Sequence, residues 1–144
     1  MSEVLFDCTI QVSRHSSKKN EKRIHRNSKT KKLFVSKSSK ALHCEQWLLH
    51  KLMIERLKQR VDKIECDINA EFVFYFPKSI YFTKDGTRSK KLPDLSNLYE
   101  LPQDCLQQTM IISNDTQIVS HNGSRRESSD AAFYSLRIIL SKSS

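Results

Sequence analysis

Two long stretches of this 144-residue chain alternate between apolar and polar side chains, and this alternation constrains the fold more than any other feature. In residues 4–13 the apolar positions are Val4, Phe6, Cys8, Ile10 and Val12. In residues 64–76 they are Ile64, Cys66, Ile68, Ala70, Phe72, Phe74 and Phe76. Because successive side chains of a strand point to opposite faces, this period of two predicts two β-strands that each bury one face. We expect the phenylalanines to belong to the core rather than to a base-stacking platform.

Two other segments have the three- and four-residue spacing of amphipathic helices. In residues 41–60, which contain no Gly or Pro, the apolar positions are Leu42, Leu49, Leu52, Met53 and Leu57. The second segment begins at Asp94, a good N-cap residue, and its apolar positions are Leu95, Leu98, Leu101, Cys105 and Leu106. Pro102 removes a backbone donor from this segment, so we expect a kink or break near residues 98–101.

Weaker patterns predict short strands near residues 33–35 and 118–119 and a last strand near residues 132–140. Residues 78–93 are expected to form a basic connector, and a loop is expected around Arg125 and Arg126. The length suits one domain over residues 1–144. The order of elements predicts an α/β (α+β) fold with a mixed sheet of about four to five strands and two main helices on one face.

The positive charge of the chain is concentrated in one basic arm, residues 18–40. Lys plus Arg number 25 and Asp plus Glu 16, a net charge of +9, and this arm has ten basic groups and one acid. A neutral body with one basic arm is typical of a polyanion binder, although a solvated loop is the alternative. The predicted DNA-binding residues of the arm and of a second cluster are Lys18, Lys19, Lys22, Arg23, Arg26, Lys29, Lys31, Lys32, Arg88, Lys90 and Lys91.

Other classes of protein do not fit the sequence. No apolar run approaches the roughly 20 residues of a membrane span, and residues 1–4 lack the features of a secretory signal. The four cysteines form no C-x-x-C pair, so we expect free thiols rather than a zinc site or a disulfide frame. We therefore expect a cytoplasmic protein.

Two acidic residues stand where carboxylates usually remain accessible: Asp94 at a helix start and Asp115 at a polar corner. Two such oxygen ligands can hold Mg²⁺, which polarises a phosphoryl oxygen and activates water. An N-cap and a turn are the ordinary structural uses of these two positions.

The motif region, residues 94–118, resembles a known signature. Residues 91–98 read Lys-Leu-Pro-Asp-Leu-Ser-Asn-Leu, and Asp104-Cys105-Leu106 and Ser113-Asn114-Asp115-Thr116-Gln117-Ile118 follow. This pattern resembles that of the RusA-type Holliday junction resolvases, which is basic-x-Pro-Asp-x-Asp-Asn-Leu, then Asp-Ala-Leu, then Asp-Asp-x-Gln-Ile. The spacing agrees from Asp94 to Ile118 without a gap.

The resemblance implies a homodimeric, Mg²⁺-dependent endodeoxyribonuclease, in which Mn²⁺ can substitute. Such enzymes resolve four-way DNA junctions in recombination and repair by paired symmetric nicks, so the implied partner is branched DNA, with no membrane or small-molecule substrate. The implied catalytic and metal-binding residues are Asp94 and Asp115. Asn97 and Asp104 match supporting positions, with Asn97 expected to orient a carboxylate.

Three positions depart from the family pattern. Ser96 replaces the second Asp of the first motif, Glu100 replaces a Lys, and Asn114 replaces the first Asp of the Asp-Asp pair. Glu100 could supply the missing carboxylate only if the kink at Pro102 reorients it. Three hypotheses follow: an active nuclease, a catalytically impaired relative that binds branched DNA without cutting it, and an unrelated basic nucleic-acid-binding module.

Overall fold

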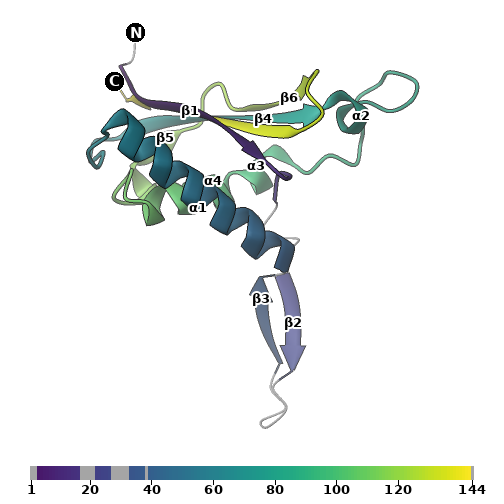
Figure 1. Cartoon of the computed structure of the whole chain (residues 1–144), viewed down its shortest axis with the longest axis horizontal. Coiled ribbons are helices and arrows are strands. Elements are labelled where there is room, and N and C mark those ends of the chain that lie inside the picture. The colour runs from purple at the N-terminus through teal and green to yellow at the C-terminus, as the bar shows by residue number, and fades with distance from the viewer. Residues whose placement is uncertain (1–2, 17–21, 27–32, 38, 144) are drawn as a thin grey trace.

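The computed structural model describes residues 3–16, 22–26, 33–37 and 39–143, which form a five-stranded mixed sheet, helices on one of its faces and a separate hairpin (Figure 1). The sheet runs β1 (Val4–Val12), β7 (Tyr134–Lys142), β4 (Ile68–Pro77). Both β5 (Ile118–Ser120) and β6 (Arg125–Ser129) pair with the other edge of β4. The β1–β7 and β7–β4 pairs are antiparallel, whereas β5 and β6 are parallel to β4. The predicted fold class is confirmed.

The long helix α1 (Ser39–Gln59) packs against β1 and against α4 (Glu100–Gln108). Its buried apolar positions are Cys44, Leu48 and Leu52, spaced by four residues. The predicted apolar stripe was therefore only partly right, because Leu42, Met53 and Leu57 are exposed. These three residues have helical spacing, but α1 buries the adjacent face, which carries Cys44, Leu48 and Leu52, against β1 and α4.

Strand β4 occupies the centre of the core. Its inward side chains are Ile68, Ala70, Phe72, Phe74 and Phe76, all buried, so the prediction that the phenylalanines form core is confirmed. The strand is shorter than the predicted residues 64–76, because its neighbour β7 ends at Lys142, directly opposite Ile68. Upstream of that point, Ile64 forms an isolated bridge with Ile112.

Two strands were not predicted. Strand β6 lies where a loop was expected, and its sequence Arg-Arg-Glu-Ser-Ser lacks the apolar alternation of a strand that buries one face. It pairs with β4 from Arg125, opposite Val73, to Ser129, opposite Pro77. Strand β2 (Lys22–Arg26) pairs with β3 (Leu33–Lys37) in an antiparallel hairpin, where only one short strand was expected. Backbone hydrogen bonds form both ladders, and these bonds are independent of side-chain polarity.

The edge strand β1 is covered by side chains of α1. The indole Nε1 of Trp47 donates to the carbonyl of Gln11 at 2.8 Å, and the Nε2 of Gln59 donates to the carbonyl of Asp7 at 2.9 Å. An edge strand with open carbonyl groups is a template for pairing with another chain. These two contacts therefore fix α1 on the sheet and occupy part of that edge.

The ring of His15 packs against aromatic side chains of the neighbouring strands β4 and β7. Its Nε2 donates to the carbonyl of Tyr75 at 2.8 Å, and its centroid lies 4.7–5.4 Å from the rings of Phe74, Phe76 and Tyr134. Burial lowers the pKa of His15 from an ordinary 6.5 to about 4. The imidazole of His15 is therefore uncharged in the folded protein near pH 7.

This buried imidazole predicts acid sensitivity. The unfolded chain protonates His15 near pH 6.5 while the folded chain resists protonation down to about pH 4, so this residue's contribution to stability is complete above pH 6.5 and declines as the pH falls. Between these limits the free energy of unfolding should fall by about 1.4 kcal/mol per pH unit from this residue. Urea denaturation of His15→Phe should show that slope removed.

The matched control is His50→Phe, which replaces an exposed imidazole on α1. The control should retain the wild-type slope. An unchanged slope in His15→Phe would contradict the assignment of this acid sensitivity to His15.

Candidate metal site and nucleic-acid surface

The motif region begins with two helices in close succession, α3 (Leu95–Leu98) and α4. They are interrupted at Tyr99, whose φ and ψ of −72° and −32° remain helical. This interruption confirms the break predicted near residues 98–101. Leu98 and Leu101 are buried in the core, so the helices are anchored by their apolar face and Ser96 and Glu100 are exposed.

The carboxylate of Asp94 is exposed at the N-cap of α3. Its side chain makes no capping hydrogen bond, and no other described residue bonds or pairs with it; its backbone carbonyl accepts from the amide of Asn97 at 3.1 Å. The ordinary structural use of an N-cap Asp is therefore not realised here. This carboxylate is available to a cation.

Asp115 is the first residue of the short helix η2 (Asp115–Gln117), and its carboxylate is also exposed. The capping bonds are made by its neighbours: the Oδ1 of Asn114 accepts from the Thr116 amide, and the Oε1 of Gln117 accepts from the Asn114 amide, both at 2.9 Å. The Nε2 of Gln117 reaches back to the carbonyl of Ile64 at 2.9 Å. Asn114, which departs from the family pattern, thus has a structural role that leaves the side chain of Asp115 unused.

Along the chain, Asp94 directly precedes α3 and Asp115 lies beyond the end of α4. The amide of Asp115 donates to the Oε1 of Gln107, in the last turn of α4, at 3.2 Å. The pairing of Asp94 and Asp115 at one metal ion stays a prediction.

The other residues expected to support the site lie on α3 and α4. Asn97 is half-buried on α3, and Asp104 is half-buried on α4. Among the described residues there is no cluster of three His, Cys, Asp or Glu side chains that could hold a metal ion. Mg²⁺ often takes only one or two protein carboxylates and keeps several waters, so the exposed aspartates suit this ion individually.

The β5–β6 segment, residues 118–129, contacts the motif region through Arg126 and His121. The Nη1 of Arg126 donates to the carbonyl of Pro93 at 3.0 Å, directly before Asp94. His121 stacks on Tyr99 with ring centroids 4.1 Å apart. Sequence reasoning did not single out His121, because its partners come from distant parts of the chain.

One tautomer of His121 satisfies both of its hydrogen bonds. Its Nδ1 donates to the carbonyl of Ala70 and its Nε2 accepts from the Nε2 of Gln103, both at 2.9 Å. Burial lowers the pKa of His121, which favours this neutral form. The ring therefore joins β4, α4 and the β5–β6 segment.

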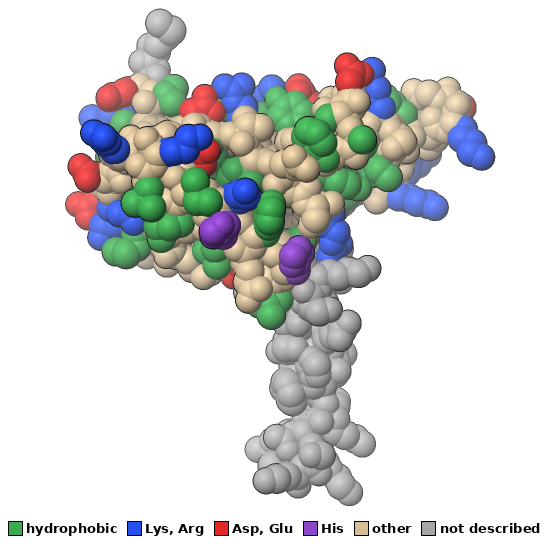
Figure 2. All heavy atoms as spheres, viewed as in Figure 1, with side chains coloured by type: hydrophobic (Ala, Val, Ile, Leu, Met, Phe, Trp, Pro, Cys, Tyr) green, Lys and Arg blue, Asp and Glu red, His purple; other side chains and the backbone are tan. Residues whose placement is uncertain are grey.

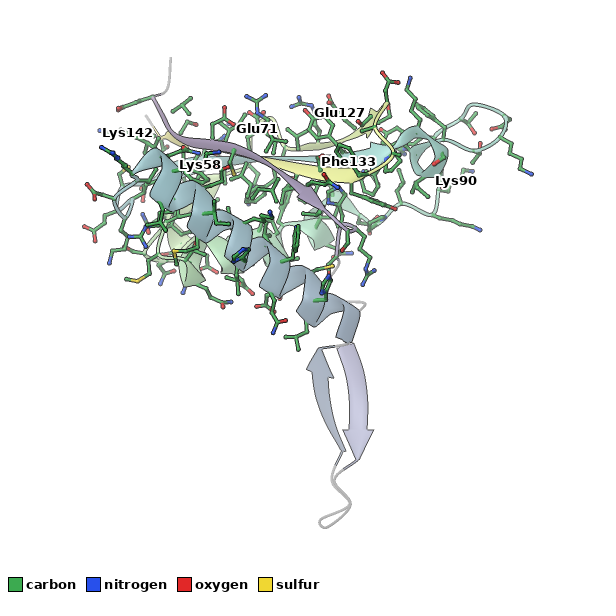
Figure 3. The ribbon with its side chains drawn as sticks, in the orientation of Figure 1. Lys58, Glu71, Lys90, Glu127, Phe133 and Lys142 are labelled. Atoms are coloured by element: carbon green, nitrogen blue, oxygen red, sulfur yellow. The ribbon has the colours of Figure 1, made fainter. Side chains whose placement is uncertain are left out.

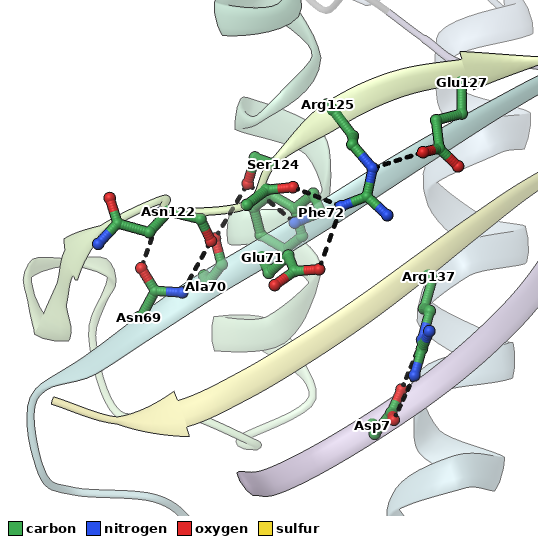
Figure 4. Close-up of polar contacts among 11 residues, drawn as sticks. Asp7, Asn69, Ala70, Glu71, Phe72, Asn122, Ser124, Arg125, Glu127 and Arg137 are labelled. Atoms are coloured by element: carbon green, nitrogen blue, oxygen red, sulfur yellow. Dashed lines mark hydrogen bonds and ion pairs between the residues drawn. The ribbon is translucent and has the colours of Figure 1, made fainter. Parts of the chain in front are cut away.

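The face of the sheet opposite the helices is polar and balanced in charge. Arg137 pairs with Asp7 at 2.9 Å, and Arg125 pairs with Glu127 at 2.7 Å and with Glu71 at 3.4 Å (Figure 4). These pairs neutralise the arginines in place. This face is therefore a poor candidate for binding a polyanion.

The basic surface lies instead on the connection between α2 (Lys78–Tyr81) and α3. Residues of this connection line a groove of about 960 Å³. Four exposed cations belong to the groove: Lys84, Arg88, Lys90 and Lys91. Figure 2 shows basic side chains along this projecting end of the molecule.

The remaining predicted DNA-binding residues belong to the arm. The backbone of Lys22, Arg23 and Arg26 is described as part of β2, but their side chains are not. The other arm residues lie outside the described part of the chain: Lys18, Lys19, Lys29, Lys31 and Lys32.

The bond from Arg126 to Pro93 predicts a local effect of mutation. Arg126→Ala should lower the free energy of unfolding by about 1.5 kcal/mol, the usual scale for a hydrogen bond from a charged donor. Hydrogen exchange should become faster in residues 93–99 and stay unchanged in β1. Arg125→Ala, which removes an exposed arginine from the same strand, is the control and should leave exchange in residues 93–99 unchanged. Equal effects of the two variants would contradict a specific role for Arg126.

A comparison with known protein families supports the resemblance seen in the motif region, and the matched residues extend beyond that region. The family model described as Endodeoxyribonuclease RusA matches residues 13–134. A search of curated proteins finds no match. Within the described residues, every helix is too short or too polar to cross a membrane. Because the family match covers most of the chain, the protein belongs to the RusA family of endodeoxyribonucleases.

Proposed function

We propose that this protein is a Mg²⁺-dependent, structure-specific endodeoxyribonuclease that resolves four-way DNA junctions by paired symmetric nicks, with Mn²⁺ able to substitute. Membership of the RusA family implies endonuclease activity on Holliday junctions and argues against the unrelated basic module. The observation that carries the finer proposal is the exposed, unpartnered carboxylate of Asp94, which follows Lys91 of the basic groove by three residues. We propose that the protein acts on DNA in the cytoplasm.

In this proposal Asp94 and Asp115 hold the metal ion, and the basic residues bind the phosphate backbone. Bound Mg²⁺ supplies Lewis-acid polarisation of a phosphoryl oxygen and activation of water. The bond from Arg126 to the Pro93 carbonyl fixes the backbone immediately before Asp94. Asn97 and Asp104 are proposed as supporting residues on the same helices.

We propose a homodimer, because paired nicks on opposing strands need two equivalent sites. Asp94 precedes α3 and Asp115 follows α4 along the chain, so the two ligands of one ion can come from the same chain or from both protomers. In the second arrangement each site depends on the dimer.

The proposal predicts metal-dependent cleavage. A synthetic four-way junction should be nicked in the presence of Mg²⁺ or Mn²⁺, and Asp94→Asn and Asp115→Asn should each reduce the rate by at least about 100-fold, because each loses a charged ligand. A gel assay of labelled strands measures the rate. Intact junction binding without any cleavage by the wild type would contradict the nuclease proposal.

Mixing the two variants distinguishes the two arrangements of the site. If each ion lies between protomers, a dimer of one Asp94→Asn chain and one Asp115→Asn chain contains one intact site and should nick one strand. If both ligands come from the same chain, every site in the mixed dimer is defective and no activity should return.

The impaired relative is a second candidate function, favoured by Ser96 and Glu100. Both side chains are exposed near Asp94, where the family pattern has a carboxylate and a cation. A hydroxyl is a much weaker Mg²⁺ ligand than a carboxylate. In this case the protein binds branched DNA without cutting it.

Restoring the family residues tests this second candidate. If the wild type binds but does not cut, Ser96→Asp combined with Glu100→Lys should gain cleavage, because the missing ligand and cation return to the exposed side of the helices. The same junction assay measures the gain. A paired control, Glu65→Lys, changes charge at an exposed site outside the motif region and should gain nothing.

A further inference from the structure

The basic groove contains a small hairpin, residues 82–88, closed by backbone bonds. Phe82 and Arg88 form an antiparallel bridge, and the amide of Thr83 donates to the carbonyl of Thr87 at 2.8 Å. The amide of Gly86 donates back to the carbonyl of Thr83 at 3.0 Å. Gly86 has a φ of +84°, which a residue with a side chain adopts only with strain.

The carboxylate of Asp85 ties the two sides of this hairpin together. Its Oδ1 accepts from the hydroxyl of Thr83 and, at 2.8 Å and 3.1 Å, from the hydroxyl and amide of Thr87. These bonds lower the pKa of Asp85 to about 2. The exposed carboxylate of Asp85 thus links the two sides of the hairpin.

The cations of the groove have no such partners. Lys84, Arg88, Lys90 and Lys91 are exposed, and none forms an ion pair within the described residues. Elsewhere on the body, Lys78, Arg125 and Arg137 each pair with an acid. The groove is therefore a local concentration of unneutralised charge on a short, hydrogen-bonded loop. Lys90 lies beside α2 (Figure 3).

We propose that this groove binds the phosphodiester backbone of one arm of the DNA junction, and that Asp85 preorganises the hairpin for this contact. The inference rests on the proposed function, because it takes branched DNA as the ligand. The groove cations supply charge, and the bonds of Asp85 hold the loop that carries Lys84 and Arg88 in one shape. A loop ordered before binding loses less conformational freedom on binding.

The role of Asp85 can be separated from simple charge, because the two effects have opposite signs. If charge alone matters, Asp85→Ala removes an acid from a basic groove and should tighten DNA binding. If Asp85 organises the hairpin, the same change should weaken binding, by about fivefold on the scale of ordering one or two side chains. Fluorescence anisotropy with a labelled four-way junction in EDTA measures the affinity without cleavage.

Two further variants complete the test. Asp130→Ala removes an acid that pairs with Lys78 and leaves the hairpin intact, so it should bind as tightly as the wild type or more tightly. Thr83→Val combined with Thr87→Val breaks the hydroxyl bonds to Asp85 without changing charge, and it should weaken binding as Asp85→Ala does. Thermal denaturation checks that each variant is folded.

The position of the DNA is tested by salt dependence. Lys84→Ala and Arg88→Ala should each reduce the slope of log affinity against log salt concentration by about one unit per lost phosphate contact, whereas Lys58→Ala on α1 should not. Unchanged slopes would overturn the groove as the DNA site, and tighter binding by Asp85→Ala would overturn the role of Asp85. Failure of the wild type to bind any junction would instead overturn the proposed function itself and this inference with it.

Discussion

The pairing of β4 with its neighbours is the interaction on which the rest of the structure depends. On one side β7 forms an antiparallel ladder from Ile68 to Tyr75, and on the other side β5 and β6 form consecutive parallel ladders. The inward side chains of β4 are buried beneath the helices. Because both edges of β4 are occupied, the register of this strand fixes where each end of the motif region lies.

That register explains how the motif region is held. The β5–β6 segment runs parallel to β4 and delivers His121 to Tyr99 and Arg126 to Pro93. At the other end of α4, Gln107 contacts the backbone of Asp115. The helices are thus supported at both ends by residues outside them, while the carboxylates of Asp94 and Asp115 remain exposed.

The strength of each sequence signal explains which elements could be predicted. Strand β1 and helix α1 have long, regular apolar periods, and both were predicted within two residues of their observed bounds. Strand β6 has five consecutive residues without an apolar side chain, so no periodicity could reveal it. The start of β4 at Ile68 could not be predicted either, because it depends on where the partner strand β7 stops and not on the apolar–polar alternation.

The sequence by itself determined the class of fold, the order of the main elements, the basic clusters and the family motif from Asp94 to Ile118. These features are local, since each is encoded by residue type and spacing over a few turns or one strand. Only the tertiary structure decided that Arg126 donates to the carbonyl before Asp94, that His121 stacks on Tyr99 and that Gln107 accepts from the amide of Asp115. The physical reason is that contacts between elements depend on strand register and helix packing, and the spacing of a motif specifies neither.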